Sequence, residues 1–165
     1  MEFPKGFIWG TASSAHQVEG NDKNCDWWDW EVNKPSGRKY PLEPSGEGCN
    51  SYERYVEDFD YCRKLNNNAV RISLAWNRIE PDEGKFNQEV VDHYIKVLKS
   101  AQERGLKTFV TLHHFTNPSW FAKKGGFINF KSPRYFARYA KFCAEKFGGL
   151  IDVYLTINEP QVYAL

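Results

Sequence analysis

Short apolar runs alternate with longer segments of helical periodicity along this chain, and this alternation strongly limits the folds open to it. Three segments place apolar side chains at helical spacing, and four apolar runs lie before, between and after them. The predicted strands are residues 6–12, 69–76, 106–112 and 153–157, and the predicted helices are residues 51–65, 88–104 and 132–147. Such alternation is typical of parallel strands joined by right-handed crossovers. We therefore expect an α/β fold.

The connections between these elements differ in length at the two ends of the strands. Those leading into a strand are short: residues 66–68, 105 and 148–152. Those leaving a strand are long and carry many polar and aromatic residues, as in residues 13–50. This asymmetry favours a barrel whose working face lies at the carboxyl ends of its strands. A doubly wound open sheet would share the alternation, but the glycine-rich phosphate loop typical of that fold is missing after the first strand.

Local signals mark the predicted helix ends. Ser51 and Asn87 are candidate N-caps, and Ser132 with Pro133 combines a cap with a proline at the first helical position. Gly105 lies where helices commonly end in a left-handed residue. The chain shows no repeat or domain linker, so its 165 residues are expected to belong to one domain.

The stretch Thr156–Pro160 ends the fourth predicted strand in an amide, a carboxyl and a proline. Pro160 has no N–H to extend a ladder, and it disfavours helical angles at Glu159. The Glu159 carboxyl should therefore hold a fixed position at a strand end, where catalytic side chains collect in parallel barrels. For Asn158 and Glu159 to address one ligand the strand must twist or bulge, because neighbouring residues otherwise point to opposite faces. Alternatively, Glu159 is a solvated acid that opens the next helix.

Arg71 lies inside the second predicted strand, on the same face as Ser73 and Ala75. A buried guanidinium is costly unless a carboxylate meets it. One interpretation is an ion pair that locks two strands together. The other is that Arg71 orients a catalytic carboxylate across the barrel and keeps it ionised.

The four histidines do not suggest a metal site. His113 and His114 are strand neighbours that point to opposite faces, so they cannot easily share one ion. We expect one of them to face the site as a hydrogen-bond donor to a hydroxyl and the other to be packed. His16 and His93 are too scattered to form a ligand set. We therefore expect neither a metal nor a cofactor.

The residues after the first predicted strand include polar groups that fit a sugar. Gln17 offers a donor and an acceptor from one amide, which matches a vicinal pair of hydroxyls, although an ordinary polar loop is the preferred interpretation of Gln17 and Glu19 taken alone. Aromatic residues reach 16% of the chain, and the cluster Trp27–Trp30 lies in this predicted loop. Tryptophan rings there could stack on the C–H faces of a sugar or pack in a core.

Charge and cysteine usage exclude other classes of protein. The net charge of +1 gives no case for nucleic acid or an anionic membrane surface. The cysteines lack C-x-x-C spacing, which argues against a zinc or thiol redox motif, and a Cys25–Cys49 disulfide is a minor alternative to reduced thiols. Residues 1–10 contain only a short apolar run, too short for a signal peptide or membrane span. We therefore expect a cytoplasmic protein.

Four ordered motifs resemble family 1 glycoside hydrolases, the β-glucosidase and β-galactosidase type. They are Phe3–Ala12 with Gln17–Gly20, Arg71–Ile79, Thr111–Phe115 and Thr156–Pro160. The resemblance extends along the whole chain and implies a (β/α)8 TIM barrel. It also implies exo-acting hydrolysis of β-glucosides, β-galactosides and related oligosaccharides, with retention of configuration by double displacement.

By this resemblance, Glu159 is the general acid/base and Asn158 binds the sugar 2-hydroxyl. Gln17 and His114 bind hydroxyls of the terminal sugar, and Arg71 supports the nucleophile. The chemistry agrees with these residue types, since a glycosidic oxygen is a poor leaving group that needs a proton from a carboxylic acid.

The chain departs from the family pattern in one large respect. Retaining enzymes need a second carboxylate about 5–5.5 Å from the first. In this family it follows strand seven in a Thr/Ile-Glu-Asn-Gly motif, which this chain lacks. Barrels typically need about 250 residues. We therefore interpret residues 1–165 as the N-terminal half of one catalytic domain, covering roughly the first four β/α units. The chain alone is expected to be inactive and to need the C-terminal half-barrel for a complete site.

Two alternatives remain open. The chain could be a non-catalytic sugar-binding or assembly module that keeps the sugar-contacting residues. It could also belong to a different barrel glycosidase, such as an inverting one, with Glu19 or Glu80 as the partner carboxylate.

Overall fold

The computed structural model describes residues 2–33 and 43–164, and these residues contain one parallel sheet. Its strands are β1 (Gly10–Ala12), β2 (Ala69–Ser73), β3 (Lys107–His113) and β4 (Val153–Ile157). They lie side by side in the order β1-β2-β3-β4, and all three pairings are parallel. The α/β class and the parallel alternation predicted from the sequence are therefore confirmed.

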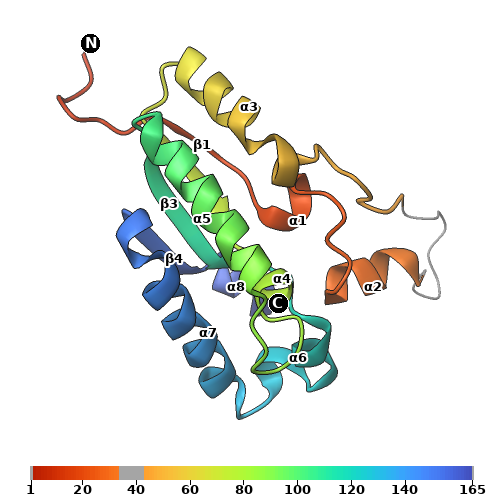
Figure 1. Ribbon diagram of the computed structural model, residues 1–165. Helices are drawn as coiled ribbons and strands as arrows, with labels where there is room; N and C mark the ends of the chain where they lie inside the picture. Colours follow the sequence, from red (N-terminus) through yellow and green to blue (C-terminus); the bar gives the residue numbers. More distant parts are fainter. Residues whose placement is uncertain (1, 34–42, 165) are drawn as a thin grey trace.

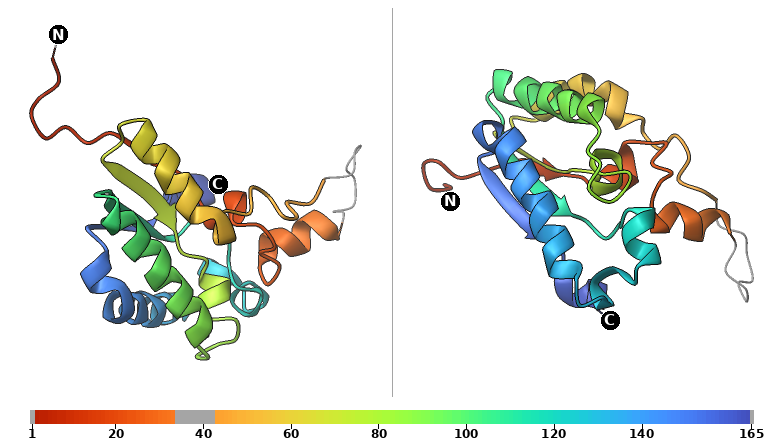
Figure 2. Two further views of the ribbon diagram at one scale, coloured as in Figure 1. Left: turned by 45° about the horizontal axis from the view of Figure 1, so that its top comes forward. Right: turned by 60° about the horizontal axis from the view of Figure 1, so that its bottom comes forward.

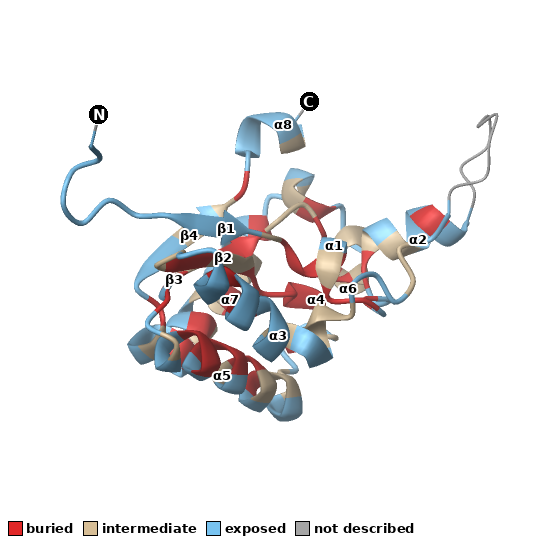
Figure 3. Ribbon diagram, turned by 90° about the horizontal axis from the view of Figure 1, so that it is seen from above, coloured by how far each residue is buried: buried red, intermediate tan, exposed pale blue. Residues whose placement is uncertain are grey.

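Three long helices connect the strands and lie together on one side of the sheet (Figures 1 and 3). They are α3 (Ser51–Lys64), α5 (Gln88–Glu103) and α7 (Ser132–Phe147). The shorter helices are α1 (Ala15–Val18), α2 (Asp26–Val32), α4 (Trp76–Ile79), α6 (Ser119–Lys123) and α8 (Pro160–Ala164), with 3-10 turns η1 (Gly126–Ile128) and η2 (Gly148–Leu150). Within the described residues, no helix is both long and apolar enough to cross a lipid bilayer.

The core lies between the sheet and these long helices. Alternate strand residues point to one face. Val110 and Leu112 pack there, together with Leu74 just after β2 and helix residues such as Leu98 and Phe147. Each of these side chains is 4% exposed or less. Burial of this apolar face holds the strands and helices together, because removing apolar area from water is the dominant favourable contribution to folding.

The other face of the sheet, which we call the open face, bears Arg71 and an apolar strip on β3 and β4. Register places Arg71 beside Phe109 and Phe109 beside Val153. Val153 is 39% exposed, and Phe109, Leu155 and Ile157 are half-buried. Helix α8 lies on this side of the sheet, opposite α5 (Figure 3). Apolar residues on both faces of a strand are typical of a barrel, in which the inner face packs against other strands.

The first two strands are shorter than predicted. The first strand was expected over residues 6–12 but is Gly10–Ala12. The preceding backbone is held by the side chain of Asn68, which accepts from the Trp9 N–H and donates to the Phe7 carbonyl. The second strand was expected to reach Trp76 but ends at Ser73. The chain leaves the ladder because the Ala75 N–H donates to the Tyr94 hydroxyl instead.

The predicted caps are partly right. The Asn87 side chain accepts from the N–H groups of the first turn of α5, and Gly105 has φ +67°, so both predictions are confirmed. The prediction for Ser51 is wrong: Asn50 is the cap residue, and the Ser51 hydroxyl donates to Asp58. Ser132 is likewise the first helical residue rather than the cap.

The segment predicted as one long polar loop, residues 13–50, contains α1 and α2 in its described part. Both helices are short, and they lie at the carboxyl-terminal side of the sheet (Figure 2). Residues 34–42 of this segment lie outside the described residues.

Candidate active site

The carboxyl ends of the four parallel strands meet at one edge of the sheet, and the candidate residues follow them. Gln17 lies on α1 after β1, His114 directly follows β3, and Asn158 and Glu159 directly follow β4. Arg71 projects from within β2. In a parallel barrel this is the edge at which active sites form.

Arg71 reaches across β3 to the end of β4. Its Nε donates to Thr111 Oγ1 at 3.0 Å, and its terminal NH2 group donates to Asn158 Oδ1 at 2.5 Å. The Asn158 N–H also donates to the His113 carbonyl at 2.9 Å, so backbone and side chain of Asn158 are both held. Because Asn158 Oδ1 accepts from Arg71, the NH2 group of the same amide points away from Arg71 and is available as a donor.

The predicted ion pair that would lock two strands through Arg71 is not observed. Within the described residues, Arg71 makes no ion pair with a carboxylate. Neutral oxygens of Thr111 and Asn158 take its hydrogen bonds instead. The charge of Arg71 is therefore not neutralised by a described side chain.

Glu159 occupies a strained backbone position at the end of β4. Its φ is +44°, in the left-handed region that residues with a Cβ rarely adopt. Pro160 follows it as the first residue of α8, and the Glu159 side chain is exposed. Phe115, at the corresponding position after β3, has φ +66°. Strained residues of this kind collect at functional sites, and here they interrupt the strand alternation at two neighbouring strand ends.

His114 and His113 have different surroundings. His114 is half-buried; burial lowers its pKa, the charge of Arg71 lowers it further, and the Glu159 carboxylate acts in the opposite direction. These effects place His114 within electrostatic reach of both residues. His113 is 1% exposed, its Nε2 lies 3.1 Å from Asn117 Oδ1, and burial lowers its pKa to about 4. His113 is thus the packed histidine of the two.

Gln17 joins this group by its position after β1. Its side chain is exposed, and its Oε1 accepts from the Ser14 hydroxyl at 2.8 Å. Within the described residues, no hydrogen bond links Gln17 to Arg71, His114 or Glu159. The Ser14 contact turns the Gln17 NH2 group outward as a donor.

Aromatic rings form a border beside His114 that the sequence did not specify. The rings of Trp27 and Phe115 stack at a centroid distance of 5.9 Å, and Phe115 and Tyr163 stack at 6.4 Å. Trp27 is 41% exposed. Three separate segments, α2, the β3 end and α8, contribute to this stack. Trp27 of the tryptophan cluster therefore lies beside the candidate site.

The whole chain, residues 1–165, matches the family described as Glycosyl hydrolase family 1. The chain belongs to this family. β-Glucosidase A of Thermotoga maritima is 32% identical over 99% of this chain and 38% of that protein. β-Glycosidase BGL167 has a TM-score of 0.89 at 42% identity, over 96% of this chain and 37% of that one. A rice β-glucosidase mutant, solved in a covalent complex with Glc, has a TM-score of 0.91 at 31% identity. The match covers 98% of this chain and 35% of that one.

These comparisons confirm the resemblance and the fold class. Family 1 β-glycosidases are (β/α)8 barrels, and this chain contributes roughly four of the β/α units. It spans only between 35 and 38% of the length of the three relatives above.

In this family 1 chain, Glu19 and Glu80 are engaged in buried contacts. Tyr94 donates to Glu19 at 2.8 Å and Arg78 lies 3.1 Å from it, while burial raises the pKa of Glu19 to about 7. Glu80, 0% exposed, accepts from the Trp76 indole and from Arg138. Because both carboxylates are buried and paired with an arginine, their surroundings argue against either acid as the partner carboxylate of an inverting enzyme.

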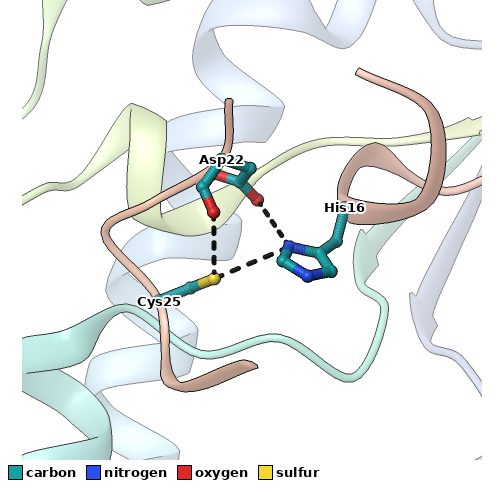
Figure 4. Close-up of side chains that lie close together, drawn as sticks. All are labelled: His16, Asp22 and Cys25. Carbon is teal, nitrogen blue, oxygen red and sulfur yellow. Dashed lines mark hydrogen bonds and ion pairs between the residues drawn. The ribbon is translucent and has the colours of Figure 1, made fainter. Parts of the chain in front are cut away.

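The first βα connection also contains a buried polar cluster, which we call the His16 cluster: His16, Asp22 and Cys25 (Figure 4). Burial opposes the charged imidazolium, but the Asp22 carboxylate, the Cys25 thiol and the Glu31 carboxylate beside the ring outweigh burial and raise the pKa of His16 to about 11. From the sequence we expected no metal ligand at His16, because His16 and His93 are too scattered to form a ligand set. All four cysteines are free thiols, so the alternative Cys25–Cys49 disulfide is wrong.

Proposed function

We propose that this chain supplies the general acid/base and the sugar-binding residues of a retaining β-glycosidase of the exo-acting β-glucosidase or β-galactosidase type. The observation that carries the proposal is the convergence at the strand ends: Glu159 beside an Asn158 amide that Arg71 orients, with His114 in electrostatic reach. The family membership and the covalent Glc complex of the rice relative support it.

In the first step, the Glu159 carboxylic acid donates its proton to the glycosidic oxygen as the bond to the anomeric carbon breaks. A second carboxylate attacks that carbon from the opposite face and forms a covalent glycosyl-enzyme. In the second step, the Glu159 carboxylate takes a proton from water, and the water oxygen displaces the enzyme carboxylate. The exposed position of Glu159 leaves it open to a leaving group and to water.

Asn158 and Arg71 act together in this proposal. Arg71 holds Asn158 Oδ1, so the Asn158 NH2 group is free to donate to the sugar 2-hydroxyl. That hydrogen bond strengthens as positive charge develops in the oxocarbenium-like state. Arg71 has no carboxylate partner among the described residues, and its guanidinium can therefore support a nucleophile from elsewhere.

His114 and Gln17 bind hydroxyls of the terminal sugar. The lowered pKa of His114 keeps its ring neutral near pH 7, so the ring offers one donor and one acceptor. Its Nδ1 is buried and has no hydrogen-bond partner in the described structure. Gln17 contributes the NH2 group that Ser14 leaves unused.

The nucleophile is expected on residues of the C-terminal half-barrel. Within the described residues, neither Glu19 nor Glu80 is available, and the open face exposes apolar side chains that a barrel would bury. We therefore propose that the 165 residues alone are inactive and that the other half completes the site. The four free thiols agree with a reducing, cytoplasmic location, which we retain as part of the proposal.

The test uses a fused enzyme, in which this chain replaces the matching residues of β-glucosidase A of T. maritima. We expect the fused enzyme to hydrolyse an aryl β-glucoside and the isolated chain to be inactive. Robust turnover by the isolated chain would contradict the division of catalytic residues. A folded fused enzyme without any β-glycosidase activity would contradict the proposed function itself.

A second function, a non-catalytic sugar-binding module, is favoured by one observation: the sugar-contacting groups are oriented although the second carboxylate is missing. Calorimetric titration of the isolated chain with glucose distinguishes the two functions. Measurable affinity of the isolated chain, together with a folded fused enzyme that does not hydrolyse β-glucosides, would favour the binding module; hydrolysis by the fused enzyme would favour the glycosidase.

A further inference from the structure

The His16 cluster places three metal-binding atoms around one point. His16 Nδ1 lies 3.5 Å from Asp22 Oδ2 and 3.7 Å from Cys25 Sγ, and the three ligand atoms all lie within 4.8 Å of one another. All three residues are buried, and Cys25 is 0% exposed. Figure 4 shows the imidazole of His16 on α1 facing the two side chains of the following loop.

The contact between His16 Nδ1 and the Asp22 carboxylate is longer than a simple hydrogen bond. The Cys25 thiol, by contrast, lies at hydrogen-bonding distance from His16 Nδ1 and donates to the Asp22 carbonyl at 3.4 Å. An N–H···O bond normally brings its heavy atoms to about 2.7–3.2 Å, and Asp22 Oδ2 has no hydrogen-bond partner in the described structure. Tetrahedral zinc has bonds of about 2.0–2.3 Å, which place its ligand atoms roughly 3.3–3.8 Å apart. The two distances from His16 Nδ1 fall in that range.

The second ring nitrogen of His16, Nε2, faces a carboxylate, as is usual for metal-bound histidines. His16 Nε2 lies 2.8 Å from Glu31 Oε1, at hydrogen-bonding distance. The other oxygen of Glu31 accepts from the Ser45 N–H and hydroxyl, both at 2.8 Å. A carboxylate on Nε2 fixes the ring and its tautomer and leaves Nδ1 as the ligand atom.

We propose that His16, Asp22 and Cys25 form a site for a divalent ion of the zinc class, with a water molecule as fourth ligand. Imidazole, carboxylate and thiolate together favour zinc over magnesium or calcium, which prefer all-oxygen shells. The ion displaces the proton between the imidazole and the carboxylate and the proton of the thiol. Binding thus links α1, which carries Gln17, to the loop before α2, which carries Trp27.

The test is a titration of the purified 165-residue chain with Zn²⁺ after chelator treatment, with long equilibration because the cluster is closed to solvent. We expect one ion per chain and release of about two protons per ion, measured calorimetrically in buffers of different ionisation enthalpy. Co²⁺ should give a thiolate-to-metal charge-transfer band. A folded chain that binds no Zn²⁺, or binds it without the charge-transfer band for Co²⁺, would overturn the proposal.

Matched variants locate the site. Cys25→Ser should abolish the Co²⁺ charge-transfer band, whereas Cys49→Ser, at an exposed cysteine, should keep it. Glu31→Gln should keep the band but weaken Zn²⁺ affinity by about 10–100-fold, the usual effect of losing a partner of a ligating histidine. Circular dichroism checks that each variant is folded. A band that persists in folded Cys25→Ser, or is lost in Cys49→Ser alone, would overturn the assignment.

Discussion

At the scale of single residues, the site depends on two left-handed backbone positions at neighbouring strand ends. Phe115 follows β3 at φ +66°, and Glu159 follows β4 at φ +44°. Such conformations cost roughly 1–3 kcal/mol each, so the surrounding contacts must hold them. Arg71 and the His113 carbonyl hold Asn158 directly beside Glu159. The geometry around Glu159 is therefore set by its neighbours rather than by its own preference.

The role of Asn158 leads to the first prediction. In the fused enzyme, Asn158→Ala should lower kcat/KM for an aryl β-glucoside by about 100-fold, because the donor to the 2-hydroxyl is lost. The wild-type fused enzyme should discriminate strongly against the 2-deoxy substrate. The variant should no longer do so, and steady-state kinetics with both substrates checks this. Unchanged discrimination in the variant would show that Asn158 does not contact the 2-hydroxyl.

His113 leads to a prediction about pH. Its folded pKa of about 4 lies below the unfolded value of 6.5, so the unfolded chain binds more protons between these values. His113 therefore makes unfolding easier as pH falls from about 6.5 toward 4, by at most about 1.4 kcal/mol per pH unit. Urea unfolding at pH 7 and pH 5 should show a smaller loss of stability in His113→Gln than in the wild type. An equal loss in both chains would contradict the buried, neutral state of His113.

The sequence predicted some of these residues and missed others for physical reasons. Glu159 and Asn158 follow a strand directly, so strand-end chemistry and Pro160 make them visible in the sequence. Trp27 and Phe115 come together only through the packing of distant segments. The His16 cluster was missed because His16 lies on a four-residue helix and Asp22 and Cys25 lie in the loop after it, where no helical or strand period relates their directions.

At the scale of elements, the long helices were predictable and the short ones were not. The helices α3, α5 and α7 carry apolar stripes over several turns, and their predicted bounds agree with the structure to within one residue. The helices α1 and α2 are too short for a periodic signal. The first strand has only three ladder residues, because the Asn68 side chain takes hydrogen bonds that a longer strand would make with a neighbour.

The N-cap of α5 gives an element-scale prediction. Asn87 Oδ1 accepts from the N–H groups of Glu89 at 3.0 Å and Val90 at 3.4 Å. Asn87→Ala should lower the free energy of unfolding by about 1 kcal/mol, the usual loss for a cap. The matched control is Ser51→Ala, at a residue that does not cap α3, with a change of roughly 0.5 kcal/mol or less. Urea denaturation compares the two variants, and equal losses would contradict the capping role of Asn87.

At the scale of the whole molecule, the sheet has one face covered by helices and one open face with an apolar strip. The sequence predicted the barrel class from alternation and loop lengths. It could not predict which strand residues remain exposed, because a barrel strand is apolar on both faces. The edges of β1 and β4 also lack a strand partner among the described residues.

The open face gives a prediction that compares the isolated chain with the fused enzyme. Leu155 is half-buried in this chain, whereas in a complete barrel its side chain would be enclosed by other strands. Leu155→Glu should change the melting temperature of the isolated chain little and should strongly destabilise the fused enzyme, by about 3 kcal/mol or more. The control is Val56→Glu on α3, at a residue that is 41% exposed, with a small effect in both contexts. Similar effects of Leu155→Glu in the two contexts would contradict barrel completion.

The central claim is that Glu159 gives its proton to the departing sugar oxygen, and leaving-group dependence tests it most directly. In the fused enzyme, Glu159→Gln should lower kcat/KM by about 100-fold or more for an aryl β-glucoside whose phenol has a high pKa, because that phenol needs protonation. For a dinitrophenyl β-glucoside, which needs none, the loss should be much smaller. An equal loss on both substrates would contradict the assignment of Glu159 as the general acid.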